Sequence, residues 1–132
     1  MSQLIAGQEI AAKVFVINRA LLISYANASG DQNPIHQDED FAKSVGLPDV
    51  IAHGMLTMAL AGKYLSDISG AAAVMEFSAK FIKPVVVPAD TDVELVLSGK
   101  VTEVVEGKAK IELLATCNGV KVLGVAKGLI KI

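Results

Sequence analysis

Apolar residues follow a helical spacing through much of the first half of the chain and alternate with polar residues through most of the second half. Residues 8–18 (QEIAAKVFVIN) are an early exception, because their loose alternation with period two predicts a half-buried strand. Asn18 is a typical N-cap residue and predicts a helix over 19–28 (RALLISYANA), with several apolar side chains near one face, that ends at Gly30.

Two shorter segments separate this helix from the middle of the chain. A proline in residues 31–36 (DQNPIH) disfavours helical geometry in the residue before it, so this segment is predicted to be a turn or loop. Asp38 is placed to cap a short helix over 39–45 (EDFAKSV), which Gly46 ends. The connector that follows, 47–54, is unusually apolar for a loop, and we expect it to be packed rather than mobile.

The segment 55–65 (MLTMALAGKYL) predicts the main helix of the protein. It has no clear polar face before Lys63, which is typical of a helix buried on nearly all sides. Gly62 lowers the helix propensity by about 1 kcal/mol relative to alanine. Its presence therefore indicates a constraint from packing or from a ligand.

The second half of the chain predicts a sheet. Pro84 and Pro88 bracket a short apolar run, which is typical of an edge or a bulge. Turn signals at 106–108 (EGK) and 118–119 (NG) divide the final third into three strands of a meander. The expected strands cover 8–18, 72–83, 91–105, 109–117 and 120–130. Together they predict an α+β fold in which one antiparallel sheet wraps around one long central helix.

Length and composition fit a compact domain. The 132 residues, 52% of them apolar, can bury a core, and we expect one domain over 1–132. The formal net charge is −2 and no basic stripe is present, so nucleic acid is not an expected partner. The longest uncharged stretch, 51–62, falls short of the roughly 20 apolar residues that span a membrane. Membrane insertion is therefore not expected.

Cys117 is the only cysteine, which excludes an intramolecular disulfide and favours a reducing, cytoplasmic location. No basic segment followed by a long apolar run opens the sequence, so no secretory signal is indicated. We expect Cys117 to be a buried, inert thiol, because no neighbour in sequence would lower its pKa. One cysteine and two histidines do not make a metal site, and no metal is expected.

The loop 31–36 places two titratable side chains, Asp31 and His36, close together. A carboxylate and an imidazole held against the same water molecule can act as base and acid near neutral pH. Addition of water across a carbon–carbon double bond requires both. The composition of the loop leaves a second interpretation open, in which Asp31 only caps backbone amides.

His53, Gly54 and Met55 lie where the main helix is predicted to begin. The first amides of a helix lack internal acceptors, and the helix dipole adds positive potential there. The amide of Gly54 could therefore serve as an oxyanion hole for a thioester carbonyl. Equally, Gly54 could simply permit a tight turn into the helix. His53 is expected to orient the loop through a hydrogen bond.

Three blocks resemble the MaoC-like hydratases. Residues 25–36 (YANASGDQNPIH) resemble the hydratase signature of that family: an aromatic residue, a spacer, then Ser-Gly-Asp-x-Asn-Pro-aliphatic-His. Residues 51–56 (IAHGML) resemble the family's loop into the central helix of the hot-dog fold. Residues 81–85 (FIKPV) look like a family strand with a Pro-Val ending.

The resemblance implies a hot-dog fold, usually dimeric, and (R)-specific hydration of trans-2-enoyl thioesters or the reverse dehydration of (R)-3-hydroxyacyl thioesters. The carrier would be coenzyme A or acyl carrier protein, with no other cofactor. By motif position, Asp31 and His36 are the implied catalytic pair, Asn33 is a supporting polar residue, and the Gly54 amide is the donor to the thioester.

Family members hold the acyl tail along the central helix, which here implicates Thr57, Met58, Ala61, Gly62 and Leu65. We hypothesise that the small Gly62 leaves room for a medium or long chain.

Two other functions remain open. A hot-dog thioesterase would place its carboxylate on or near the central helix, where 55–64 has none and Asp67 comes late. A non-catalytic subunit of a heterodimeric dehydratase can lose the Asp/His pair, whereas this chain retains both. A homodimer or larger hot-dog oligomer is expected, with a heterodimer as the alternative.

Overall fold

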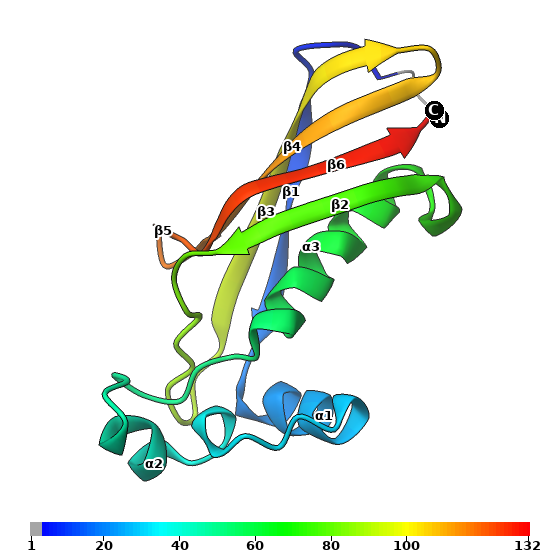
Figure 1. The fold of residues 1–132 in the computed structure, drawn as a ribbon. Helices are drawn as coiled ribbons and strands as arrows, with labels where there is room; N and C mark the ends of the chain where they lie inside the picture. The colour runs from blue at the N-terminus through cyan, green and yellow to red at the C-terminus, as the bar shows by residue number, and fades with distance from the viewer. Residues whose placement is uncertain (1–3) are drawn as a thin grey trace.

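The computed structural model of this protein describes residues 4–132, and its strands form one antiparallel sheet (Figure 1). The strand order is β1-β3-β4-β6-β2, with the short β5 paired to β4. The strands are β1 (Glu9–Ile17), β2 (Val74–Phe81), β3 (Val93–Val105), β4 (Lys108–Cys117), β5 (Val120–Lys121) and β6 (Leu123–Lys131). The helices are α1 (Arg19–Ser29), α2 (Glu39–Ser44) and α3 (Gly54–Ser69), with short 3₁₀ turns η1 (Pro34–His36) and η2 (Ala71–Ala73).

Both predicted hairpin turns of the meander are present. Glu106 and Gly107 have φ of 52° and 74°, and Asn118 and Gly119 have 53° and 76°. Positive φ at both central residues matches the right-handed twist of the flanking strands. Along β4 buried and exposed residues alternate almost without interruption, so one face of this strand covers the core.

The prediction of a single final strand over 120–130 is wrong, because two strands, β5 and β6, cover this segment. It divides at Val122, which is buried and donates its amide hydrogen to the carbonyl of Ala115. Val125 has a positive φ of 47°, and the pairing of β6 with β2 shifts register nearby. The strand is therefore bent by irregular backbone, a feature that regular alternation of apolar residues does not report.

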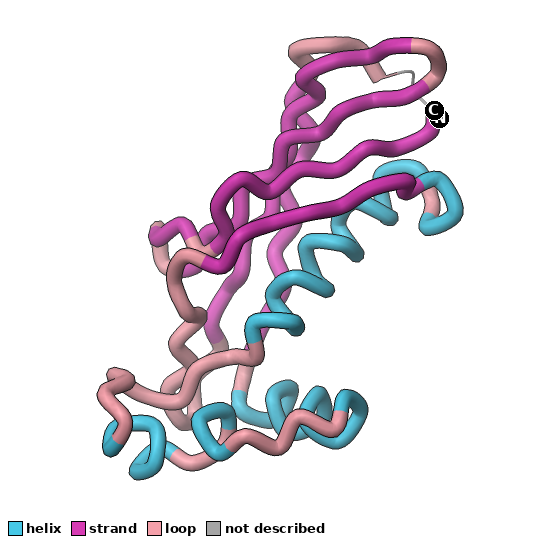
Figure 2. The backbone as a smooth tube through the Cα atoms, in the orientation of Figure 1, coloured by secondary structure: helices cyan, strands magenta, loops and turns pink. Residues whose placement is uncertain are grey.

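Helix α3 crosses the sheet, with the edge strand β1 on one side and β6 and the edge strand β2 on the other, which confirms the predicted architecture (Figure 2). On one side the Tyr64 hydroxyl donates to the carbonyl of Ala11 in β1 at 2.8 Å. On the other, Leu65 packs on Gly128 of β6 so closely that a Cβ built on that glycine would lie 2.2 Å from Leu65 Cδ2. Gly128 thus permits the close approach of helix and strand.

The prediction that the main helix is buried on nearly all sides is wrong. Met55 is 57% exposed, and Lys63 and Asp67 are also exposed. The helix also continues to Ser69, beyond the predicted end at residue 65. The small and apolar residues of its first turns concealed an amphipathic helix, because alanine and glycine are compatible with either face. No helix within residues 4–132 is long and apolar enough to cross a membrane.

Helices α1 and α2 and the turn η1 lie together at the end of the molecule where α3 begins (Figure 1). The predicted caps are present: the side chain of Asn18 accepts from the Leu21 amide, and that of Asp38 accepts from the Phe41 amide. Gly30 ends α1 in the left-handed conformation, with φ of 83°. The connector 47–54 is packed as expected, since Val50 is fully buried within it.

Candidate active site

Short-range hydrogen bonds shape the loop that follows α1. One carboxylate oxygen of Asp31, Oδ1, accepts from the Asn33 amide at 3.2 Å. The side chain of Asn33 in turn accepts from the Ile35 amide at 3.2 Å and caps η1, whose last residue is His36. Capping therefore occupies only one oxygen of Asp31, and the other, Oδ2, remains directed toward His36. The half-exposed Asp31 side chain caps the loop and faces the imidazole at the same time.

The imidazole of His36 is buried and has a fixed orientation. Its Nδ1 lies 2.7 Å from the carbonyl oxygen of Ile51. Because a carbonyl can only accept, Nδ1 must carry the proton, and Nε2 of the neutral ring keeps a free lone pair. Nε2 lies 4.0 Å from Asp31 Oδ2, too far for a direct hydrogen bond. Two proton acceptors therefore face each other across a gap that one small polar molecule can bridge.

His53 contacts both members of this pair. Its ring stacks on that of His36, with centroids 3.9 Å apart and planes 24° apart, and the tilted ring of Tyr25 has its centroid 4.8 Å from that of His53. Its Nε2 lies 3.2 Å from the carbonyl oxygen of Asp31, which is the loop-orienting hydrogen bond predicted for this residue. Burial lowers the pKa of His53, so the ring is neutral near neutral pH.

Asp31, His36 and His53 each offer a ligand atom within 4.8 Å of the others. The lone pairs of an imidazole lie in the plane of its ring, and the two rings are nearly parallel, so their lone pairs do not converge on one point. Each ring also uses one nitrogen on a backbone carbonyl. The arrangement therefore fits proton transfer better than chelation of a metal ion.

A hollow of about 400 Å³ opens beside His36 at the beginning of α3. Its lining includes His36, Gly54, Thr57, Phe81, Ile82 and Lys83. The amides of Leu56 and Thr57 donate to the His53 carbonyl, whereas Gly54, as the first residue of the helix, has no acceptor one turn earlier. The amide of Gly54 and the positive end of the helix dipole thus lie beside the hollow, where a carbonyl oxygen could enter and accept a hydrogen bond.

Residues 3–116 match the sequence profile of the family described as MaoC like domain. The chain belongs to this family. Among curated proteins it is 42% identical over 79 residues to 3-hydroxyacyl-thioester dehydratase X of Mycobacterium tuberculosis, which covers 59% of this chain and 27% of that protein. It is 51% identical over 35 residues to the peroxisomal enoyl-CoA hydratase 2 of Arabidopsis thaliana, 26% of this chain and 11% of that protein. The matches thus span about a quarter or less of these relatives.

Solved structures with the same fold superpose on this MaoC-like chain. A protein described as a MaoC-like dehydratase superposes with a TM-score of 0.94 at 32% identity, over 98% of this chain and 41% of that one. The (R)-hydratase from A. caviae, described as involved in PHA biosynthesis, superposes with a TM-score of 0.85 at 25% identity, over 100% and 99%. The predicted hot-dog fold is confirmed.

The residues expected along the acyl tail are not gathered in this hollow. Of the five, only Thr57 lines it. Ala61 and Leu65 are fully buried between α3 and the sheet. Gly62 faces the ring of Phe77, whose Cε2 would lie 3.6 Å from a Cβ built on the glycine. Met58 is half-buried and does not border the hollow. In this MaoC-like chain, strands β2 and β6 cover the helix face that the prediction assigned to the tail.

Two groups that shape the site were not predicted from the sequence. The ring of Phe81 lies over Gly54, so that a Cβ built there would meet Phe81 Cε1 at 3.4 Å. Phe81 opens the FIKPV block, and its position at the end of β2, three residues before Pro84, was the available signal. The carbonyl of Ile51, which sets the proton position on His36, is a backbone atom and leaves no signal in the sequence.

A larger hollow, about 830 Å³, lies at the opposite end of α3, between that helix and β1. Asp67 borders it and pairs with Lys13 at 2.6 Å and with Lys63 at 3.3 Å. The hydrogen bond from Lys13 holds the pKa of Asp67 below its ordinary value. Cys117 is buried, and burial raises the pKa of its thiol, as the prediction of an inert thiol requires.

Proposed function

We propose that this chain is a hydro-lyase that adds water to trans-2-enoyl thioesters, or removes it from (R)-3-hydroxyacyl thioesters, carried by coenzyme A or acyl carrier protein. One observation carries the proposal: Asp31 Oδ2 faces His36 Nε2 at 4.0 Å, and His36 lines a hollow whose wall also includes Gly54, the first residue of α3. Membership of the MaoC-like family supports it.

The 4.0 Å separation suits a shared water molecule, which could lie about 2.8 Å from both atoms. For hydration, one of these two acceptors first takes up a proton from solution, so that the pair holds one proton when the reaction begins. The unprotonated member takes a proton from water as the water oxygen bonds to C3, and the protonated member gives its proton to C2. The pair again holds one proton afterwards. Dehydration reverses the two roles.

The negative charge that develops on the thioester oxygen needs stabilisation while C2 awaits its proton. The Gly54 amide lies at the positive end of the 16-residue helix α3 and lacks a side chain that would obstruct an oxygen atom. Asn33 acts indirectly, by capping η1 and holding His36 in place. In this proposal Asp31 and His36 are catalytic residues, Gly54 provides the oxyanion donor, and Asn33 is a positioning residue.

The hollow suits the reacting head of such a substrate. Ile35, Ile51, Ile82 and Val85 give it apolar walls, and exposed Lys83 lies at its margin. The apolar walls fit an acyl group, while the carrier remains outside. Hydration involves no net oxidation or reduction, so the proposal needs no cofactor beyond the carrier.

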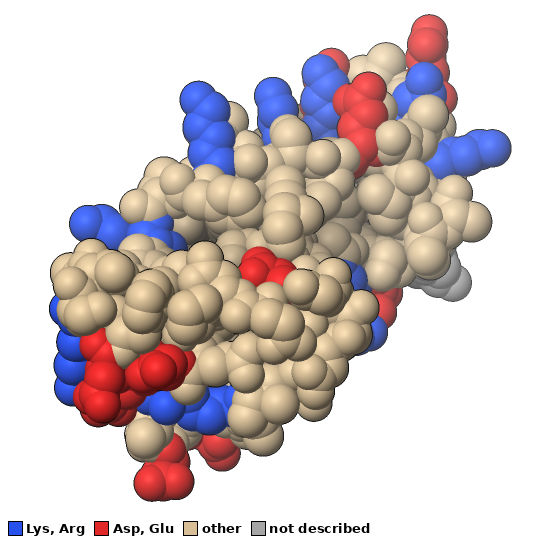
Figure 3. All heavy atoms as spheres, turned by 60° about the horizontal axis from the view of Figure 1, so that its bottom comes forward, with Lys and Arg blue, Asp and Glu red and all other residues tan. Residues whose placement is uncertain are grey.

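We extend the proposal to a homodimer. Met55, Met75, Phe81 and Ile82 are each 48–57% exposed, and they lie on the start of α3 and on or beside β2, which ends the sheet. A free strand edge beside exposed apolar residues favours pairing with another chain. Uncharged residues also cover much of the surface turned forward in Figure 3. The ChsH1–ChsH2 complex of Mycobacterium tuberculosis, with a TM-score of 0.84 at 18% identity, has the same fold, and a heterodimer is the alternative.

The proposal is tested by following the loss of enoyl-thioester absorbance with crotonyl-CoA and with a longer 2-enoyl-CoA. Wild type should hydrate at least one of them, and Asp31→Asn and His36→Gln should each lower kcat by about 10²- to 10⁴-fold. Release of free thiol without hydration would indicate a thioesterase instead. A folded wild-type protein inert toward CoA and acyl-carrier substrates would favour the non-catalytic subunit and contradict the proposal.

A further inference from the structure

Arg19 occupies a position that helix energetics alone do not explain. It is the first residue of α1, where the helix dipole disfavours a positive charge. Its side chain is nevertheless largely covered, with 24% exposed. Tertiary contacts must therefore account for its placement.

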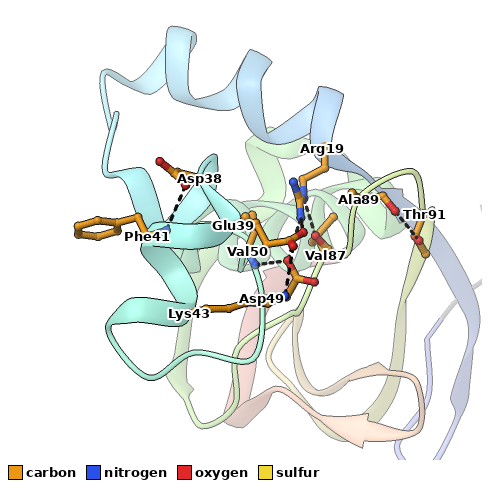
Figure 4. A network of polar contacts seen from close by, with 10 residues as sticks. All are labelled: Arg19, Asp38, Glu39, Phe41, Lys43, Asp49, Val50, Val87, Ala89 and Thr91. Atoms are coloured by element: carbon orange, nitrogen blue, oxygen red, sulfur yellow. Dashed lines mark hydrogen bonds and ion pairs between the residues drawn. The ribbon is translucent and has the colours of Figure 1, made fainter.

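The guanidinium of Arg19 joins three segments that are distant in sequence (Figure 4). Nε donates to the carbonyl of Val87 at 2.6 Å. Nη2 donates to Asp49 Oδ1 at 2.8 Å and to Glu39 Oε1 at 3.3 Å. The Asp49 side chain is the more covered of the two carboxylates, 17% exposed against 39%, so the Arg19–Asp49 pair is the stronger contact.

The same carboxylate fixes the beginning of the connector that leads to α3. Asp49 Oδ1 accepts from the Val50 amide at 2.7 Å. From there the connector is hydrogen-bonded on both sides. The Val87 amide donates to the Val50 carbonyl at 2.8 Å, and the Ile51 amide donates to the Ile35 carbonyl at 3.2 Å. The connector is thus held between the segment around Val87 and the turn η1.

This connector carries the carbonyl that orients the imidazole. His36 Nδ1 donates to the carbonyl of Ile51, two residues beyond Asp49. A shift of that carbonyl would rotate His36 or change which nitrogen bears its proton, and so displace Nε2 from Asp31 Oδ2. A misplacement of about 1 Å at a reacting group can cost on the order of 100-fold in rate.

We propose that the Arg19–Asp49 pair positions the catalytic imidazole, by fixing the connector whose Ile51 carbonyl holds the Nδ1 proton of His36. Both are positioning residues, since they act on His36 only through the connector: their side-chain hydrogen bonds go to Val87, Glu39, Val50 and each other. This inference rests on the proposed function of His36. Arginine is required because its planar group donates to a carboxylate and to the Val87 carbonyl together, which a lysine ammonium cannot reproduce with the same geometry.

The test compares Arg19→Lys and Asp49→Asn with the matched control Lys43→Gln. Lys43 pairs with Glu39 at 3.1 Å, so its substitution removes an ion pair of the same network while the Arg19–Asp49 hydrogen bond stays in place. Each variant is characterised by thermal unfolding, by kcat and KM with a 2-enoyl-CoA, and by ¹⁵N NMR of the imidazole nitrogens of His36. The NMR signal reports which nitrogen carries the proton, and overall stability alone would not change it.

Arg19→Lys and Asp49→Asn should remain folded, lower kcat by about 10- to 100-fold with little change in KM, and shift the His36 nitrogen signals. Lys43→Gln should match wild type in all three. Wild-type His36 signals in folded Arg19→Lys and Asp49→Asn would overturn the inference. If wild type itself lacks hydratase activity, the proposed function fails, whereas shifted His36 signals would still uphold the positioning role.

Discussion

The two ends of α3 each border a hollow, and the hollows differ in what their polar groups do. The one at the C-terminal end is larger, about 830 Å³ against 400 Å³. There, the Tyr64 hydroxyl donates to a β1 carbonyl and Asp67 is paired with two lysines. At the N-terminal end, Asp31 Oδ2 and His36 Nε2 face each other without a direct hydrogen bond.

This difference distinguishes polar residues that stabilise the fold from polar residues that can react with a substrate. A polar group with its partners already in place stabilises the fold but has no capacity left for a substrate. His36 lines the smaller hollow and Asp31 faces His36, and each is oriented through one atom while a second atom stays available. Available polar atoms, more than volume, therefore identify the candidate site.

The largest expected effect distinguishes the two ends directly. Asp31→Asn and His36→Gln should each lower kcat about 10²- to 10⁴-fold, since each removes a proton acceptor or donor at the reacting carbons. Asp67→Asn at the other end is the matched carboxylate control and should retain wild-type kcat. Initial rates with a 2-enoyl-CoA provide the measurement. An equal loss of kcat in Asp67→Asn would refute the assignment of catalysis to the N-terminal end of α3 alone.

Gly128→Ala tests whether the sheet side of α3 is purely structural. The added methyl group would overlap Leu65, which is fully buried and cannot move aside freely. We expect a loss of about 1–3 kcal/mol in the free energy of unfolding, measured by urea denaturation, with kcat retained while the protein is folded. Gly62→Ala, which would only reach ordinary contact with Phe77, is the control and should not be destabilised. Equal stabilities of the two variants would count against the close packing.

Gly62→Leu tests whether an acyl tail follows α3 away from the smaller hollow. The space beside Gly62 is shared with Phe77, so a leucine would narrow any passage there. We expect kcat/KM for long 2-enoyl thioesters to fall about tenfold relative to crotonyl-CoA. Ala59→Leu, on the exposed side of the same helix, is the control. An unchanged chain-length profile in Gly62→Leu would eliminate the hypothesis.

The smallest expected effect concerns the pH dependence of stability. Because burial lowers the pKa of His53, the unfolded chain takes up a proton below pH of about 6.5 that the folded protein resists. The free energy of unfolding should therefore fall as the pH is lowered from 7 to 5, by at most about 1.4 kcal/mol per pH unit from this group. His53→Gln, measured by urea denaturation across the same range, should show a shallower decline. Parallel curves would show that His53 does not contribute.

Local signals predicted many elements of the fold correctly. The caps at Asn18 and Asp38 and the turn at Asn118 were identified because each depends on residues within a few positions of itself. The expected proximity of Asp31 and His36 is likewise present, since six residues of loop hold both, while their catalytic roles stay a prediction. The split of the last strand at Val122 was missed, because it depends on hydrogen bonds to β4 that regular alternation does not encode.

By itself, then, the sequence determined the types of element, the loop with its carboxylate and imidazole, and the family. Only the tertiary structure decided which groups meet there: the stacking of His53 on His36, the Ile51 carbonyl at Nδ1, and the ring of Phe81 over Gly54. The physical reason is that these contacts join segments far apart in the chain, and one of them uses a backbone atom common to all residues. Side-chain identity specifies local conformation, whereas packing of the sheet against α3 determines the geometry of the site.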